Sequence, residues 1–333
     1  MKLLIITQVV DKKHPVLGFF HRWIEEFAKH VEVLHVICLE EGIHELPANV
    51  HVHSLGKEVG KTRLAYFLRF YRLIISLRND YDQVFVHMNQ IYVLLGAPLW
   101  KLFRKRVSLW YMHGATSSSL TIAEKAVDTI YTGSKESFPF DSSKVIVTGH
   151  GIDTVRFAPQ TALKTLDLIT VGRITKSKNL HTLIGILSEI RKSHKVTLTI
   201  VGKVRTEQEC LYEQELKAQI RQMKLNDAVL WQGNVEQCAL PAILSQARVF
   251  VTMAQNGSLD KAILEAMACG LPVVAMAPGA VSLPLHGGYI TTEEDFISEL
   301  KKVLESDLSQ VKEYVEYVTT YHSLKTLIPK LLG

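Results

Sequence analysis

Two basic side chains, Arg173 and Lys178, occur within one short connection of the chain. Residues 166–171 predict a strand and residues 179–192 predict a helix, so the connection Gly172–Asn179 leads directly into a helix N-terminus. A guanidinium fork, an ammonium group and a helix dipole that converge on one point favour a diphosphate group. The alternative interpretation is a pair of solvated surface cations.

A carboxylate, Glu265, lies in the otherwise apolar stretch 262–269, which follows the polar loop Asn256–Asp260. A buried carboxylate is costly unless it has a partner. A ribose diol is one suitable partner, because a carboxylate accepts hydrogen bonds from both hydroxyls. The alternative is a glutamate on the solvated side of its helix. Gly270 and Pro272 then end this helix and begin the next strand.

The first half of the chain offers Gly18 and His113. Gly18 is the only glycine in the loop after the first strand, so the G-x-G-x-x-G pattern of dinucleotide dehydrogenases is absent. A helix that begins near Gly18 presents free N–H groups to an anion or a sugar hydroxyl; the alternative is a plain strand-to-helix turn. His113 follows the strand 106–111 and precedes a glycine, which suits a ligand-facing loop or a capped turn.

The elements that position these residues alternate between short β-branched runs and amphipathic helical stretches. This βαβ rhythm predicts parallel sheets with helices on both faces. It breaks near the polar connection 158–161 and then restarts. We therefore expect an α/β protein with two doubly wound domains facing a cleft. The expected boundaries are residues 1–158 and 165–310, followed by helices over 311–333 that cross back to the first domain.

Composition excludes several classes of protein. The 333 residues are 47% hydrophobic and 21% charged, the balance of a globular protein with a large core. No apolar stretch is long enough for a transmembrane helix, and the first residues do not form a signal peptide. Cys38, Cys210, Cys238 and Cys269 show no C-x-x-C spacing, which argues against a disulfide framework or a zinc cluster and fits a reducing cytoplasm.

The region 61–106 is strongly basic. It contains nine lysines and arginines and two aspartates, whereas the whole chain has a net charge of +5. On a helical wheel, Lys61, Arg69 and Arg72 share one stripe and apolar side chains fill most of the rest. We expect either peripheral contact with an anionic membrane or a sheet-covering helix with a solvated cationic stripe. No motif for nucleic-acid recognition accompanies the charge.

The motifs resemble the family 4 retaining glycosyltransferases, which have the GT-B fold. Glu265–Val274 match the E-A-M-A-x-G-x-P-V-V half of the Glu-x7-Glu motif. Gly172-Arg173 with Lys178 resembles the Gly-Arg-x4-Lys element, with Asn179 where glycine is usual. Val147–Asp153, with Phe157 and Pro159, resembles the element that precedes the linker, and Gly18 matches the amino-terminal loop loosely.

The resemblance implies two Rossmann-like domains and assigns roles to individual positions. Arg173 and Lys178 would hold the donor diphosphate, Glu265 the donor ribose, and His113 would face the donor sugar. The remaining donor-binding positions would be Gly18 and the helix start, which comprises Ser258, Leu259, Asp260 and Lys261. The implied activity is a cytoplasmic, metal-independent hexosyltransferase that retains anomeric configuration and requires no cofactor. Its partners would be a nucleotide-diphosphate sugar and a glycan or lipid-linked acceptor of polysaccharide biosynthesis.

One position departs from the family pattern. The first glutamate of the Glu-x7-Glu pair falls at position 257, which is glycine in this chain. Either another group, such as Asp260, replaces it, or the donor sugar differs, or the protein is a non-catalytic nucleotide-sugar-binding relative. A nucleotide-sugar epimerase with the same fold is a further alternative. We expect an active transferase, because the diphosphate-binding residues are present.

Overall fold

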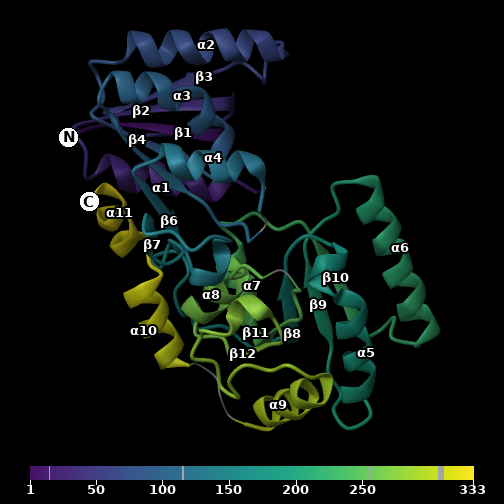
Figure 1. Ribbon diagram of the computed structural model, residues 1–333. Helices are drawn as coiled ribbons and strands as arrows, with labels where there is room; N and C mark the ends of the chain where they lie inside the picture. Colours follow the sequence, from purple (N-terminus) through teal and green to yellow (C-terminus); the bar gives the residue numbers. More distant parts are fainter. Residues whose placement is uncertain (15, 115, 256, 307–310) are drawn as a thin grey trace. The chain divides into compact units, whose positions relative to one another are not determined.

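The computed structural model describes residues 1–14, 16–114, 116–255, 257–306 and 311–333 (Figure 1). The chain forms two compact units, Met1–Gly151 with Leu324–Gly333, and Ile152–Ser323. The first unit thus ends before the expected residue 158. The reason is that Ile152 and Phe157 are buried in the core of the second unit, and the Ile152 amide donates to the carbonyl oxygen of His322 at 2.6 Å.

The first unit is built on a parallel sheet in the order β3-β2-β1-β4-β5-β6-β7. Its strands are β1 (Lys2–Val10), β2 (Val33–Glu41), β3 (Val50–Ser54), β4 (Gln83–His87), β5 (Arg106–Trp110), β6 (Thr129–Thr132) and β7 (Val145–Val147). Its helices are α1 (Gly18–Ala28), α2 (Arg63–Ser76), α3 (Gln90–Leu102), α4 (Ser118–Ala126) and α11 (Leu324–Leu332). Continuous apolar runs such as Leu3–Ile6 form the central strands, because both faces of the sheet are covered.

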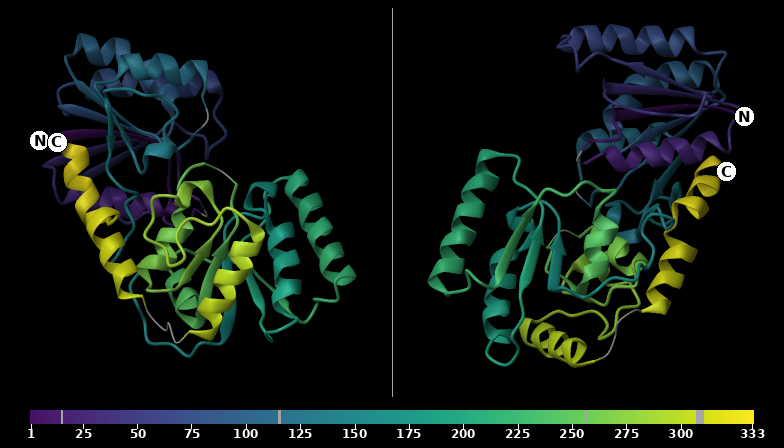
Figure 2. Two further views of the ribbon diagram at one scale, coloured as in Figure 1. Left: turned by 60° about the horizontal axis from the view of Figure 1, so that its bottom comes forward. Right: turned by 180° about the vertical axis from the view of Figure 1, so that it is seen from behind.

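The two faces of this sheet carry different helices. Side chains of α2, α3 and α4 pack on one face, and those of α1 and α11 pack on the other. The expected return of the chain is confirmed for α11 only, since α10 belongs to the second unit. Figure 2 shows α11, in yellow, beside α1. Gly151 lies under both helices: a side chain there would collide with Trp23 and Leu327, and its φ of +72° also favours glycine.

The second unit has a parallel sheet in the order β10-β9-β8-β11-β12. Its strands are β8 (Leu166–Val171), β9 (Leu198–Val201), β10 (Val229–Gly233), β11 (Ala247–Thr252) and β12 (Val273–Ala275). Its α-helices are α5 (Leu180–Ile190), α6 (Glu207–Gln222), α7 (Leu240–Gln246), α8 (Lys261–Ala268), α9 (Glu293–Glu305) and α10 (Lys312–Tyr321). Helices α7, α8 and α10 cover one face, and α5, α6 and α9 cover the other.

Both sheets confirm the α/β class and the parallel, doubly wound topology expected from the βαβ rhythm. In such sheets the loops after the strands gather at one edge, where ligands bind. The loops after β8, β9 and β11 therefore lie at the same edge of the second unit. None of the helices in the described ranges is long and apolar enough to cross a membrane.

Candidate active site

Lys178 connects the loop after β8 to the start of α8. Its ammonium group forms an ion pair with the Asp260 carboxylate, and both side chains are largely buried. Asp260 is also the N-cap of α8, because its other carboxylate oxygen accepts a hydrogen bond from the Ala262 amide at 3.3 Å. The Lys178 stem crosses the backbone of Gly172, where a Cβ atom would lie 2.6 Å from Lys178 Cε. A side chain at position 172 would therefore displace the Lys178 ammonium group, and the φ of +152° at Gly172 also favours glycine.

Asn179, at the position where the family that the motifs resemble usually has glycine, has a φ of +53°. This left-handed conformation is most accessible to glycine and is also tolerated by asparagine. The asparagine therefore keeps the turn that leads into α5. The substitution does not disrupt the loop that carries Arg173 and Lys178.

Arg173 pairs with a different carboxylate from Lys178. Its guanidinium lies 3.6 Å from Glu209 Oε1, and its side chain is 56% exposed. Glu209 is held at the first turn of α6: Oε2 accepts from the Arg205 amide at 2.7 Å, and its own amide donates to Thr206 Oγ1 at 3.2 Å. The sequence predicted that both cations share one target. In the structure each cation has its own carboxylate partner.

A third cation, Arg205, was not singled out from the sequence. It follows β9, and the loops after β8 and β9 are so closely stacked that a Cβ atom on Gly202 would collide with the Gly172 carbonyl oxygen. Burial, and then the charge of Arg173, lower the pKa of the Arg205 guanidinium. The available signal was a repeated pattern, since a glycine and then an arginine follow each of two consecutive strands. The described part of this edge thus holds two arginines close together.

Glu265 is buried inside the second unit, with a side chain only 7% exposed. The solvated alternative is therefore wrong. Glu265 Oε1 lies 3.0 Å from Lys261 Nζ and accepts a hydrogen bond from Gln237 Nε2 at 3.1 Å. Gln237 comes from the connection between β10 and α7, and no sequence signal linked it to Glu265. The carboxylate thus has the partners that its burial requires.

The loop before α8 is tightly packed at Ser258 and Leu259 and open at position 257. A Cβ atom on Gly279 would collide with the Ser258 carbonyl oxygen, and Leu259 is buried. At Gly257, in contrast, a Cβ atom would meet no atom within 4 Å. Asn256, which the sequence places at the start of this loop, lies outside the described residues.

Gly18 begins α1, as expected, but its amide is already used. It donates to the His14 carbonyl oxygen at 2.8 Å, and the Leu17 amide donates to His14 Nδ1 at 3.0 Å. A Cβ atom on Gly18 would lie 3.0 Å from the Lys12 carbonyl oxygen, so the loop folds closely over this helix start. The free amide expected at Gly18 is thus engaged within its own loop.

His113 lies after β5 in the first unit, whereas Arg173, Lys178 and Glu265 belong to the second unit. Its imidazole is exposed and lies edge-on to Tyr111, with ring centroids 5.5 Å apart. Partial desolvation lowers the pKa of His113 below its usual value of 6.5. The imidazole is therefore predominantly neutral at pH 7, and can donate or accept a hydrogen bond.

The sequence contains one Asp-x-Asp triplet, Asp80-Tyr81-Asp82. Asp82 Oδ2 accepts from the Lys2 amide at 2.9 Å, and Lys2 is the first residue of β1. The triplet therefore lies at the amino ends of β1 and β4, away from the edge where ligands bind in such sheets. Within the described ranges, no group of three or more histidine, cysteine or acidic residues is arranged to hold a metal ion.

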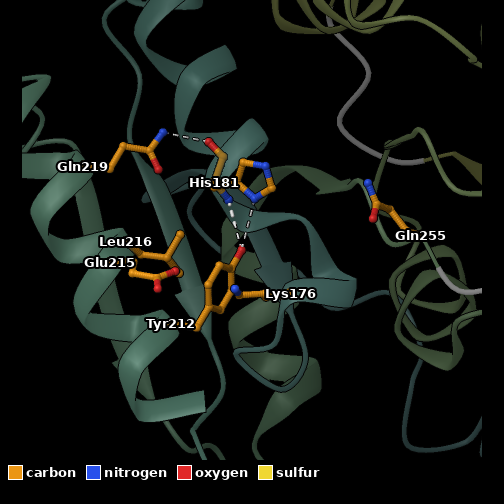
Figure 3. A pocket seen from close by; sticks show the side chains of 7 residues that line it. All are labelled: Lys176, His181, Tyr212, Glu215, Leu216, Gln219 and Gln255. Atoms are coloured by element: carbon orange, nitrogen blue, oxygen red, sulfur yellow. Dashed lines mark hydrogen bonds between the residues drawn. The ribbon is translucent and has the colours of Figure 1, made fainter. Parts of the chain in front are cut away.

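A pocket of about 350 Å³ opens between α5 and α6 in the second unit (Figure 3). Lys176 and Gln255 reach it from the loops after β8 and β11. The backbone amide of Gln255 connects these two loops, because it donates to the Ser177 carbonyl oxygen at 2.8 Å. Its wall is fixed by the His181 amide, which donates to the Tyr212 hydroxyl at 3.3 Å. Arg173, Lys178 and Glu265 do not line this pocket.

Comparison with known proteins gives the fold and a domain type. Residues 152–315 match the family described as glycosyl transferases group 1. The structure of Anabaena Alr3699/HepE in complex with UDP superposes with a TM-score of 0.80 at 18% identity, covering 100% of this chain and 98% of that one. Sucrose-phosphate synthase from Thermosynechococcus elongatus gives a TM-score of 0.77 at 14% identity, over 99% and 97%. The chain therefore has the GT-B fold.

Curated relatives match over shorter ranges. The GDP-Man:Man(3)GlcNAc(2)-PP-Dol alpha-1,2-mannosyltransferase of Caenorhabditis elegans is 24% identical over 167 residues, 46% of this chain and 36% of that protein. Glycogen synthase of Mycobacterium tuberculosis is 29% identical over 150 residues, 44% of this chain and 35% of that protein. The matched part is thus well under half the length of either relative.

Proposed function

We propose that this chain, whose residues 152–315 form a glycosyl transferases group 1 domain, is an enzyme that transfers a sugar from a nucleotide-diphosphate sugar to a glycan or lipid-linked acceptor. The observation that carries the proposal is the set of groups at the carboxyl edge of the second sheet. Arg173 and Lys178 follow β8, the capped start of α8 follows β11, and buried Glu265 lies one turn into α8.

The diphosphate is the proposed ligand of Arg173 and Lys178. The buried Asp260 carboxylate holds Lys178 in place before the donor arrives, and Glu209 lies beside the exposed Arg173 guanidinium. A phosphate oxygen replaces or joins each carboxylate, and the N-terminus of α8 contributes its dipole. As the bond to the sugar breaks, negative charge grows on the leaving diphosphate and these cations stabilise it. This supports the proposal of transfer without a metal ion.

Glu265 is the proposed ligand of the donor ribose. Lys261 and Gln237 both contact Oε1, which orients the carboxylate. A carboxylate has further lone pairs on both oxygens, and these can accept hydrogen bonds from ribose hydroxyls. Because the carboxylate is already ordered and buried, the ribose gains these bonds without the cost of ordering a flexible side chain.

His113 is proposed to contact the transferred sugar with a neutral imidazole. The lowered pKa supports this role, because a neutral ring can accept a hydrogen bond from a sugar hydroxyl. We propose that transfer retains anomeric configuration, as in the family that the motifs resemble. The lack of a carboxylate at Gly257 favours a second candidate, a non-catalytic relative that binds the nucleotide sugar without transferring it.

The acceptor proposal extends to the location of the protein. The name of the C. elegans relative includes a PP-Dol acceptor. A lipid-linked acceptor places the reaction at a membrane surface, and the basic region 61–106 supplies the charge for contact with anionic lipid. We propose that the protein is cytoplasmic and contacts the inner face of the cell membrane peripherally, without a nucleic-acid partner.

The test is a thermal-shift panel of nucleoside diphosphates and nucleotide sugars on the wild type, Arg173→Ala and Arg221→Ala. Arg221 is an exposed arginine on α6, and its substitution controls for loss of a charge from the same unit. A ligand that binds the native state raises its stability, by about 2.7 kcal/mol at a hundredfold excess over Kd. We expect nucleotides of one base to raise the melting temperature of the wild type. This rise should be lost in Arg173→Ala and kept in Arg221→Ala.

Product analysis then separates the alternatives. Sugar transferred to an acceptor supports the transferase, an altered nucleotide sugar without acceptor identifies an epimerase, and binding without turnover identifies the non-catalytic relative. No shift with any nucleotide contradicts the proposed donor site.

A further inference from the structure

Helix α2 has an exposed apolar face. Phe70 and Ile74 are the buried residues of this helix, although most of its side chains are apolar. Leu64 is 67% exposed, Leu68 is 60% exposed and Ile75 is 43% exposed. The spacing 64, 68 and 75 places these three residues on one side of the helix, opposite Phe70. We name Leu64, Leu68 and Ile75 the α2 ridge.

The α2 ridge is exposed although helix α2 is firmly packed against the rest of the first unit. The Tyr71 hydroxyl donates to the Leu95 carbonyl oxygen at 2.8 Å, and the Phe70 ring lies 5.5 Å from that of Tyr92 on α3. Thr62 caps the helix, since its hydroxyl accepts from the Ala65 amide at 3.3 Å. The inner face of α2 is thus fixed on α3. Figures 1 and 2 both show α2 as the outermost helix on its side of the first sheet.

Positive charge surrounds the α2 ridge. Residues 59–79 contain five lysines and arginines and no carboxylate. Lys61, Arg63, Arg72 and Arg78 are all exposed. Phe67 is 43% exposed on the same helix. A helix that combines exposed leucines, an aromatic ring and cations has the composition of a helix that lies in a membrane interface.

We infer that the α2 ridge inserts into the surface of an anionic lipid bilayer, with α2 in the plane of the interface and its arginines at the headgroups. The cations select the anionic surface, because each attracts acidic headgroups. The leucines and Ile75 select a bilayer over a nucleic acid, because they lose contact with water only in an apolar phase. A second copy of α2 would bring its five cations against these, which opposes self-association.

This inference deepens the proposed function, on which its biological meaning rests, by naming the surface that brings the enzyme to a lipid-linked acceptor. The test needs no nucleotide sugar. Failure of lipid binding is therefore distinguishable from failure of the proposed transfer reaction.

The experiment is co-sedimentation of the full chain with vesicles of phosphatidylcholine, alone or with about 30% phosphatidylglycerol. We expect binding to the anionic vesicles only. Leu64→Gln/Leu68→Gln should weaken this binding about tenfold or more, because both side chains insert. The matched control is Ile122→Gln/Leu211→Gln, since Ile122 on α4 is 57% exposed and Leu211 on α6 is 54% exposed. It should bind like the wild type.

A second measurement reports insertion directly. Phe67→Trp places a fluorophore on α2, and we expect brominated lipid to quench it in anionic vesicles. No binding of the wild type to anionic vesicles overturns the inference. So does equal binding of Leu64→Gln/Leu68→Gln and the wild type, which would show charge attraction without insertion. Sedimentation velocity that shows a dimer, dissolved by the same double substitution, would assign the ridge to a second copy instead.

Discussion

The ion pair between Lys178 and Asp260 joins residues that are 82 positions apart in the chain, and links the loop after β8 to the N-cap of α8. Each partner has a second task. Lys178 is the proposed diphosphate ligand, and Asp260 caps α8. The start of α8 and the cation are therefore placed together before any ligand binds, which reduces the reorganisation required during the reaction.

The first prediction is that ligand binding by Lys178 and its contribution to stability can be separated by substitution. Lys178→Met should destabilise the fold by about 1–3 kcal/mol, because it leaves the largely buried Asp260 carboxylate unpaired. Lys178→Met/Asp260→Asn should recover most of that stability, since the introduced asparagine side chain keeps a capping oxygen. Nucleoside-diphosphate binding should remain lost in both variants. Urea denaturation and calorimetric titration measure the two effects, and recovery of binding in the double variant would contradict the role of Lys178.

The second prediction concerns ribose recognition. Glu265→Gln keeps the size of the buried side chain but removes the charge that Lys261 partners. Hydrogen bonds to a charged group contribute about 1.5–3 kcal/mol. We therefore expect about 10–100-fold weaker binding of the ribonucleoside diphosphate and little change for its 2′,3′-dideoxy analogue. An equal loss for both ligands would show that Glu265 acts on the fold of the site rather than on the ribose.

The third prediction uses the open space at Gly257. A Cβ atom there meets no other atom within 4 Å. We expect Gly257→Glu to change the free energy of unfolding by less than about 0.5 kcal/mol. Affinity for the nucleoside diphosphate should stay the same, whereas turnover with different donor sugars should change. Unchanged turnover with every donor would place position 257 away from the sugar.

The fourth prediction is a pH dependence of stability. His35 on β2 lies 3.1 Å, Nδ1 to Nε2, from His53 on β3, and the His51 ring centroid is 5.1 Å from that of His35. Burial, and then the two neighbouring histidines, lower the pKa of His35 from 6.5 to about 4. Lys2 lowers the pKa of His35 further, and Asp80 raises it. Arg69 likewise lowers the pKa of His53, and Glu41 raises it.

The direction of the effect follows from proton binding. Between pH 6.5 and 4 the unfolded state binds a proton at His35 and the folded state does not, so the free energy of unfolding falls as the pH falls. Each unit of pKa difference corresponds to about 1.4 kcal/mol. His87, fully buried against Phe20 and with a pKa of about 3, adds to the same trend. Urea denaturation between pH 7 and 5 measures it, and His35→Gln should reduce the slope.

The sheets were predictable because burial on both faces leaves a local signature, a short run such as Leu3–Ile6 bounded by polar residues. The positions of Arg173 and Lys178 in the loop after a strand, and of Glu265 in the helix of the next such unit, followed from the same signature. The ion pairs of these cations with Glu209 and Asp260 could not be predicted in the same way. Each cation has several carboxylates at similar distances along the sequence, and only the fold determines which one lies beside it. Gln237 is a further example, since only the fold brings it to Glu265.

Helix α2 shows a different limit of sequence analysis. A helical wheel separates its cations from its apolar residues, and the apolar majority then suggests that the helix covers a sheet. Only part of that apolar surface is buried in the structure, because contacts with α3 through Phe70 and Tyr71 set the rotation of the helix. Leu64 and Leu68 are left in solvent as a result.

The return of α11 to the first unit has a consequence for synthesis of the chain. The second unit is one continuous segment, Ile152–Ser323, whereas the first unit needs both Met1–Gly151 and Leu324–Gly333. During synthesis, the hydrophobic side of α1 therefore stays uncovered until the chain has been made through Leu327 and Ile328 of α11. A folding helper that shields that side would act during this interval, and pulse-chase proteolysis should find α1 protected last.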